Sequence, residues 1–225
     1  MNWTMVGRLI WKDWYLNRGM IMVAIAAGMA TLAAISMMPG STIAMIVAMI
    51  VLATILIGVG AKVTMSAAEE RKQQTLPFVM SLPISYREYT TAKIAGGLLI
   101  FLVLWGALLV DIVATILLAP GFPHGLIPFT TIMCVEMLMT TCLVITIAVT
   151  TESHAWTIAA AQVGSLGLNG IGWWIVRFPD IGGVMRSATV RWSATATTLL
   201  AAELAVIALM IATTFFVQAR KKDSI

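Results

Sequence analysis

The sequence predicts an all-α integral membrane protein that forms one transmembrane domain over residues 1–225. Of the 225 residues 60% are hydrophobic and only 11% are charged, whereas soluble domains carry about 25% charged residues. Mean hydropathy is +0.96, and several apolar runs reach the ~20 helical residues that cross a ~30 Å hydrocarbon core. These runs are continuous rather than alternating with period two, which favours helices over a β-barrel.

Six apolar runs define six expected transmembrane helices. The stretch 19–61 contains no Asp, Glu, Lys or Arg, and Pro39-Gly40-Ser41-Thr42 near its middle predicts a tight turn between two helices. The third run covers 94–119 and ends at the Pro- and Gly-rich segment 120–125. The other three runs cover 128–151, 155–176 and 193–218.

Residues 1–18 precede the first span and are expected to form an interfacial helix. Apolar residues fall within one arc of this helix and basic residues lie on the far side, namely Trp3, Val6, Ile10 and Trp14 against Arg8 and Lys12. Such a helix lies in the headgroup plane of a bilayer. We therefore expect this segment to contact membrane lipid.

The basic residues are divided unequally between the two sides of the membrane. Eleven of the 14 Lys and Arg residues lie before the first span, in the connection 62–93 or in the C-terminal tail, and three lie between the fifth and sixth spans. Short loops rich in Lys and Arg stay in the cytoplasm. We expect a multi-pass protein of the cytoplasmic (inner) cell membrane with both termini cytoplasmic. The net charge of +4 is explained by this topology, so no nucleic acid partner is expected.

The connection 62–93 carries the largest cluster of charge and is expected to be structured. Thr75 is a good N-cap for a short helix that ends at Pro83. Ser85 and Glu88 have the spacing of a capping box directly before the third span. This arrangement predicts a helix, a break and a second helix rather than a simple turn.

The order of residues in this connection resembles the cytoplasmic loop of ABC-2 type permeases, the membrane subunits of bacterial ABC exporters. An acidic-basic turn at Glu69 leads to Thr-Leu, then Ser-Leu-Pro, then a basic residue and Lys93; Gln74 stands where the family commonly has Gly. The resemblance implies a coupling helix that receives force from separate ABC ATPase subunits. It further implies that ATP and Mg²⁺ bind to those subunits, that this chain holds no cofactor, and that a second copy or a sister permease completes the path. The candidate coupling residues are Glu69, Glu70, Arg71, Lys72, Thr75, Leu76, Phe78, Val79, Leu82, Pro83, Ser85, Arg87, Glu88 and Lys93.

The segment 164–192 combines four closely spaced glycines with helix-breaking residues further on. Glycines at this density loosen a helix, and irregular backbone at membrane depth persists where it is buried in protein or lines a cavity. In the resembled family two short re-entrant helices stand at this place, and we expect the same hairpin here. The alternative is a plain outer loop with an aromatic belt formed by Trp173, Trp174 and Trp192.

Asp111, Glu136 and Glu203 lie inside predicted spans, each ~12 to 15 Å below the outer surface if the helices rise ~1.5 Å per residue. A charge at that depth costs at least ~2.5 kcal/mol on insertion scales, so we expect the three carboxyl groups to share one layer and to face partners or a cavity. Two interpretations stay open: a polar lining of the transport path, or a structural role, which we favour, in which the groups form buried ion pairs or one of them is protonated. The candidate cations are Arg177, Arg186 and Arg191.

Enzyme functions find little support, and neither a catalytic residue nor a metal ligand is expected. The chain has no G-x-x-x-x-G-K-[ST] phosphate-binding loop. Glu69-Glu70 matches the start of an intramembrane protease motif, but Gln74 stands where that motif needs Arg, and His124 and His154 fall on opposite sides of the membrane. The best functional prediction is an exporter permease. The alternatives are an intramembrane peptidase-like enzyme and a non-transporting membrane anchor or assembly factor.

Overall fold

The structure is a computed structural model that describes residues 3–38, 44, 47, 48, 50–60, 62, 86–151 and 153–220, with backbone only at 86–90 and 218–220. The described residues form helices joined by turns, and no strand occurs among them, which confirms the predicted all-α class. Besides the helical residues 50–60, the elements are α1 (Trp3–Ser36), α4 (Tyr86–Leu118), α5 (Leu126–Thr151), α6 (His154–Ile175), α7 (Pro179–Gly182) and α8 (Ala194–Arg220).

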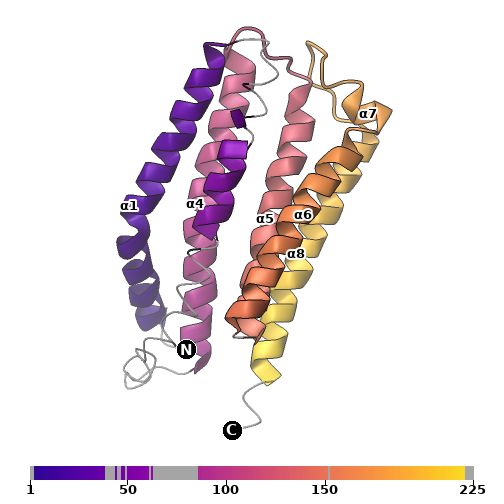
Figure 1. Ribbon diagram of the computed structural model, residues 1–225. Helices are drawn as coiled ribbons and strands as arrows, with labels where there is room; N and C mark the ends of the chain where they lie inside the picture. The colour runs from indigo at the N-terminus through magenta and orange to yellow at the C-terminus, as the bar shows by residue number, and fades with distance from the viewer. Residues whose placement is uncertain are drawn as a thin grey trace.

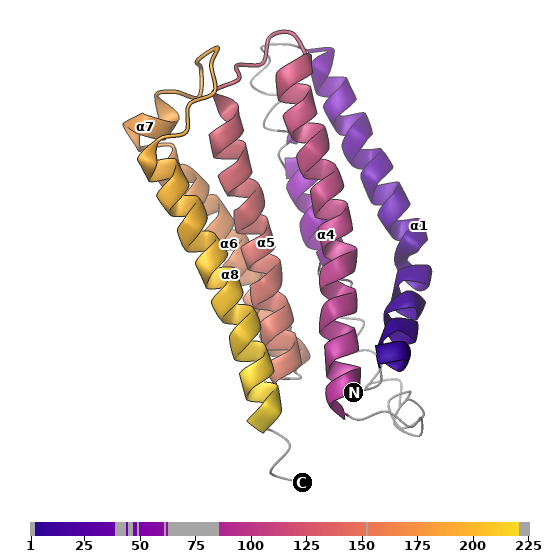
Figure 2. The same ribbon diagram turned by 180° about the vertical axis from the view of Figure 1, so that it is seen from behind.

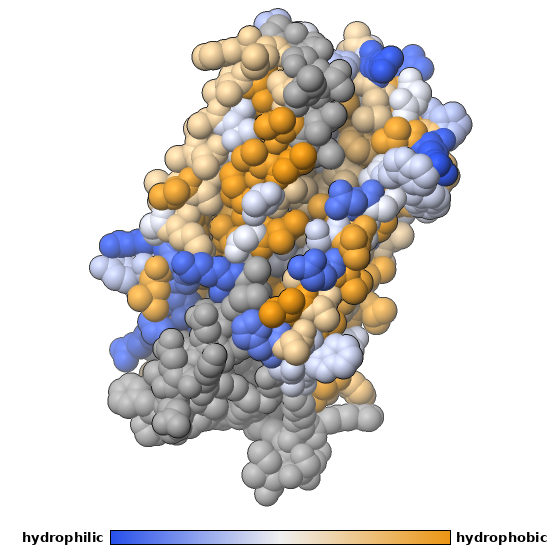
Figure 3. Space-filling model, in the orientation of Figure 1, coloured by the Kyte–Doolittle hydropathy of each residue, from blue (hydrophilic) through white to orange (hydrophobic). Residues whose placement is uncertain are grey.

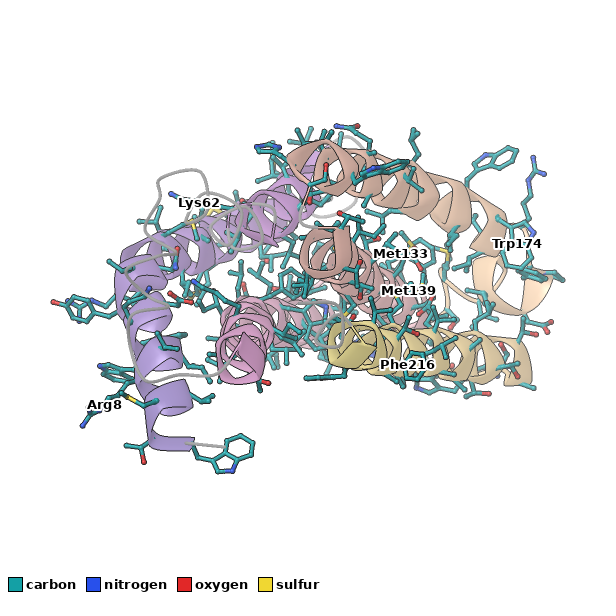
Figure 4. All side chains as sticks on the ribbon, turned by 90° about the horizontal axis from the view of Figure 1, so that it is seen from below. Arg8, Lys62, Met133, Met139, Trp174 and Phe216 are labelled. Atoms are coloured by element: carbon teal, nitrogen blue, oxygen red, sulfur yellow. The ribbon has the colours of Figure 1, made fainter. Side chains whose placement is uncertain are left out.

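The long helices lie side by side and form an elongated bundle (Figure 1). The first residues of α1 and α4 and the last residues of α8 lie at one end, which we call the N-terminal end, and α7 lies at the other, the α7 end (Figures 1 and 2). Seen along the bundle, α5 lies between α6 and α8 (Figure 4). The two faces of α5 therefore have different neighbours.

Local sequence explains where the helices begin and end. The first proline of α5, Pro128, occupies the third position of that helix, where a missing N–H is tolerated. After α4, Gly121 adopts φ 93°, a left-handed conformation that ends helices and favours glycine. Threonine hydroxyls within the helices donate to the carbonyl four residues earlier, as Thr141 does to Met137 at 3.0 Å. These bonds satisfy polar groups inside an apolar bundle.

Four helices of the described part are long and apolar enough to cross a membrane: α1, the stretch 91–118 of α4, α5, and the stretch 194–217 of α8. The surface between the two ends of the bundle is largely apolar (Figure 3), with exposed side chains such as Met22, Val110 and Leu209. Because apolar surface is stable in contact with lipid tails, the protein is a multi-pass membrane protein. The predicted count of six spans stays a prediction.

The N-terminal helix differs from the expectation of a separate interfacial element. Residues 3–18 continue without a break into the first span, so that α1 is a single helix of 34 residues. Seen from below, its N-terminal turns, which carry the outward-pointing Arg8, bend away from the direction of the rest of α1 (Figure 4). No helix-breaking residue separates the two parts, which explains their continuity.

The predicted re-entrant pair of helices between the fifth and sixth spans is wrong for the described residues 153–220. Instead, α6 continues through its glycines to Ile175, and the only helix before α8 is the four-residue α7. Two of the four glycines pack against α5: a Cβ at Gly164 would collide with the Thr140 side chain, and one at Gly172 would lie 3.0 Å from Met133 Cε. They allow α5 and α6 to approach closely.

The connection between α6 and α8 covers the α7 end of the bundle. Ile181 of α7 is buried against Ile132, Ile175 and Ala196, from α5, α6 and α8. The tryptophans Trp173, Trp174 and Trp192 are exposed, in agreement with the alternative of an outer loop with aromatic side chains at the membrane surface.

Candidate functional site

Lys93, predicted to contact the ATPase, lies against α1. Its Nζ donates to Asp13 Oδ2 at 3.0 Å, and the two side chains are only 9% and 14% exposed. Close approach of the helices is possible because Gly96, one turn further along α4, has no side chain; a Cβ there would already lie 3.7 Å from Asp13 Oδ2. The ion pair joins the N-terminal part of α1 to the beginning of α4, and a coupling role for Lys93 stays a prediction.

The remaining coupling candidates are not placed by the structure. Those from Glu69 to Ser85 lie outside the described residues, and Arg87 and Glu88 belong to the first turn of α4, where only the backbone is described. The described part of α4 begins at Tyr86, and the capping box stays a prediction because Ser85 lies outside the described residues.

Asp111, Glu136 and Glu203 lie in the middle parts of α4, α5 and α8. Glu136 is 2% exposed and Glu203 is 8% exposed, and Asp111 is partly buried. Each of the three has one buried carboxyl oxygen without a hydrogen-bond partner. Burying an ionised carboxylate without a partner costs several kcal/mol on an order-of-magnitude basis, so these three side chains need an explanation.

The favoured prediction, ion pairs with the three arginines, is wrong in the described structure. Arg177, Arg186 and Arg191 are exposed in the connections at the α7 end. The Arg177 guanidinium lies 3.4 Å from the centroid of the Trp173 ring, a cation–π contact. The arginines belong to turns at the end of the bundle, where water and lipid headgroups solvate their charges. A buried carboxylate about one-third of the way along a helix would stabilise those charges less.

The prediction that the three carboxyl groups share a layer is wrong for Asp111. The Trp105 indole N–H of α4 donates to the Cys134 carbonyl of α5 at 2.7 Å, which fixes the level of one helix against the other. From this point Asp111 lies toward the α7 end, whereas Glu136 lies toward the N-terminal end. Eight residues in total separate them along the two helices, or ~12 Å at ~1.5 Å per residue.

Glu136 and Glu203 do share a level. The Thr214 hydroxyl of α8 donates to Thr146 Oγ1 of α5 at 2.9 Å, and the two residue numbers differ by 68. Since the helices run in the same direction, other residues of α5 and α8 with this difference in number, or offset, lie at one level. Glu203 and Glu136 have nearly the same offset, 203 − 136 = 67. Both side chains are buried at this level, so the two carboxyl groups lie in the same part of the bundle. Sequence spacing alone did not reveal this pair because it depends on how α5 and α8 are aligned.

A pocket of about 500 Å³ opens on the opposite face of α5, between residues 50–60 and α6. Its lining is mostly apolar and includes Met133, Met137 and Trp173; the hydroxyls of Thr54 and Ser165 and the amide of Asn169 also line it. Polar patches interrupt the apolar surface over α6 (Figure 3). Sequence reasoning missed this pocket, although the polar residues of α6 were a visible signal.

The carboxyl pair and the pocket are separate features. Neither Glu136 nor Glu203 lines the pocket, because α8 and α6 lie on opposite sides of α5 (Figure 4). In the described part of the chain no group of three or more His, Cys, Asp or Glu residues could hold a metal ion. His124 lies at the α7 end and His154 begins α6 at the other end, too far apart to act together.

Comparison with known proteins gives one match. The family model described as ABC-2 family transporter protein matches residues 8–220. No curated protein and no solved structure matches the sequence. The family match covers every described helix apart from the first residues of α1.

Proposed function

Since the chain belongs to the ABC-2 family of transporter proteins, we propose that this transporter permease is the membrane subunit of an ATP-driven exporter. ATP and Mg²⁺ bind to separate ATPase subunits, and the permease, paired with a second copy or a sister permease, supplies the path. The observation that supports a path is the pocket between residues 50–60, α5 and α6.

The chemistry of the pocket suits amphipathic cargo. Apolar side chains cover most of its wall, and a few hydroxyl and amide groups interrupt them, the combination by which proteins hold small amphipathic ligands. The pocket is open to the side, so a partner permease facing residues 50–60 and α6 encloses it. In this arrangement movement of α6 against residues 50–60 changes the width of the path.

The coupling element is the connection 62–93. The structure places its last residues, at the beginning of α4, at the end of the bundle that also carries the first turns of α1 (Figure 1). The buried ion pair between Asp13 and Lys93 ties these two helices together. A force applied by the ATPase to the connection therefore reaches α1 and α4 as one unit.

Pocket substitutions test the path. Ser165→Trp places a large ring in the pocket, whereas Leu166→Trp, one residue further on, alters a side chain that is 73% exposed on the outer surface of α6. With the permease and its ATPase reconstituted in vesicles, we expect Ser165→Trp to reduce export of amphipathic peptides at least tenfold and Leu166→Trp to leave it near the wild-type rate. Equal transport by both variants would show that the path lies elsewhere.

Coupling is tested separately by Phe78→Asp and Leu82→Asp. An unpaired charge opposes docking of an apolar helix by several kcal/mol as an order of magnitude. We expect either variant to reach the membrane but to release the ATPase on co-purification and to lose cargo-stimulated ATP hydrolysis. Full stimulation in both would exclude this segment as the coupling element.

Topology is tested by cysteine labelling, because Cys134 and Cys142 are buried and react poorly with polar reagents. We expect a membrane-impermeant maleimide to label Ala188→Cys, an exposed position at the α7 end, in intact cells. Gln73→Cys is expected to react only after lysis, since the basic residues around it are retained in the cytoplasm. Labelling of position 73 from outside would reverse the orientation.

A further inference from the structure

The carboxyl pair of Glu136 and Glu203 is a second site, distinct from the pocket. It lies where α5 and α8 pack side by side, and both residues are more than nine-tenths buried. One turn away on each helix stand buried apolar side chains, Ile132 on α5 and Ile207 on α8. Within this apolar interface each carboxyl group has an oxygen with no hydrogen-bond partner.

The described elements packed against the pair supply no cation to neutralise it. Toward the α7 end α4 carries Asp111, itself an acid, and α6 carries no ionisable group except His154 at the far end. On α7, Asp180 accepts a hydrogen bond from Thr195 at 3.1 Å and is exposed. The other charged groups and thiols are the residues at the beginning of α4, where Lys93 pairs with Asp13, the buried thiols on α5, the exposed arginines of the connections and the residue that ends α8, namely Arg87, Glu88, Lys93, Cys134, Cys142, Arg177, Arg186, Arg191 and Arg220.

Two ionised carboxylates at one level of an apolar interface repel each other and lose their hydration, so the pair requires a positive ligand. A metal cation such as Ca²⁺ takes about 6 to 8 oxygen ligands, more than the two carboxyl groups offer. A proton needs only one oxygen to carry it and a second to accept its hydrogen bond. Like-charged carboxyl groups that cannot both ionise share one proton for this reason.

We propose that Glu136 and Glu203 form a proton-binding site in which one shared proton joins α5 to α8. With the proton present, one carboxylic acid donates to the neighbouring carboxylate, and the orphan oxygens become partners. When the proton leaves, two negative charges face each other and push the helices apart. The Thr214 hydroxyl already donates to Thr146 across the same two helices, so the proton adds a further polar link to their apolar packing. This site stands independently of the transport proposal.

Infrared difference spectroscopy of the full chain in lipid nanodiscs tests the proton directly. We expect a protonated-carboxyl C=O band at neutral pH that shifts in frequency in Glu136→Gln and in Glu203→Gln alike, because the remaining acid then donates to a glutamine amide instead of a carboxylate. Asp111→Asn is the matched control, since it removes the third buried carboxyl group but leaves the pair intact. A band that both glutamate replacements leave unchanged would overturn the proposal.

The unfolding equilibrium gives a second readout. Above about pH 5, where a glutamate of the unfolded chain is ionised, the native protein holds one proton more than the unfolded chain. Its stability therefore decreases as pH rises, and the unfolding equilibrium constant increases by up to ~10-fold per pH unit. We expect the double variant Glu136→Gln with Glu203→Gln to remove this component of the pH dependence and Asp111→Asn to preserve it. If wild-type stability is independent of pH but rises with Na⁺ at constant ionic strength, and Glu203→Gln removes that response, the ligand is a metal cation and the proposal is wrong.

Discussion

The ion pair between Asp13 and Lys93 yields a quantitative prediction about how α1 is attached to the bundle. Asp13→Asn keeps the size of the side chain but removes the charge that faces the Lys93 ammonium at 3.0 Å. Removing one member of a buried pair costs about 3–5 kcal/mol. Because the two side chains keep 9% and 14% exposure, we expect the lower value, about 3 kcal/mol or roughly 100-fold in the unfolding equilibrium.

Lys12 provides the matched control for this prediction. Its Nζ lies 3.6 Å from the other Asp13 oxygen, and its side chain is 43% exposed. Exposed pairs contribute about 0–1 kcal/mol, so Lys12→Met is expected to have little effect. Together with Lys93→Met, Asp13→Asn is expected to regain part of the lost stability, since no charge then stays buried.

The assay is denaturant titration of the purified protein in mixed micelles, followed by tryptophan fluorescence and compared at equal protein concentration. The reasoning predicts a clear order of stability: wild type and Lys12→Met together, then the double variant, then Asp13→Asn. Equal losses in Asp13→Asn and Lys12→Met would refute it, because the buried and exposed partners of Asp13 would then be energetically equivalent.

Two further predictions concern helix contacts of α5. Gly164→Ala is expected to destabilise the folded protein by about 1–3 kcal/mol because the added Cβ meets Thr140. Gly167 faces open space, so Gly167→Ala is expected to stabilise the helix by up to ~1 kcal/mol through its higher helix propensity. The melting temperatures of the two variants should move in opposite directions. Thr214→Val removes the hydrogen bond to Thr146 at 2.9 Å and is expected to cost about 1 kcal/mol. A double-mutant cycle with Thr146→Val should show coupling, and strictly additive effects would contradict the contact.

The elements of this fold could be predicted from the sequence because their signals are local. A charge-free run long enough to cross a bilayer, the turn residues that follow it and the capping residues before it all lie within a few positions of each other. The described extents of α5 and α8 agree with those signals. The likeness of the connection around Glu69 to ABC-2 permeases, also a local pattern, agrees with the family match over residues 8–220.

The glycine pattern of 164–172 was the local signal that gave a wrong prediction. Four glycines within one segment predicted a loosened helix, yet α6 is continuous to Ile175. A glycine has two opposite meanings in a membrane helix: freedom of the backbone, or space for a neighbouring helix. At Gly164 the neighbour is Thr140 of α5, and only the packed bundle shows which meaning applies.

The sequence by itself determined that the chain is helical, spans a membrane and belongs with the ABC-2 permeases. It did not determine which residues face each other, because α5 is apolar around its circumference and buried on several sides, so that no hydrophobic stripe marks the side toward α8. Partners such as Asp13 and Lys93 lie 80 residues apart, and the pair Glu136 and Glu203 depends on the alignment of two parallel helices. Contacts of this kind follow from how helix surfaces fit together in three dimensions, and they decided that Glu136 and Glu203 lie at one level inside the bundle while the arginines stay exposed at its end.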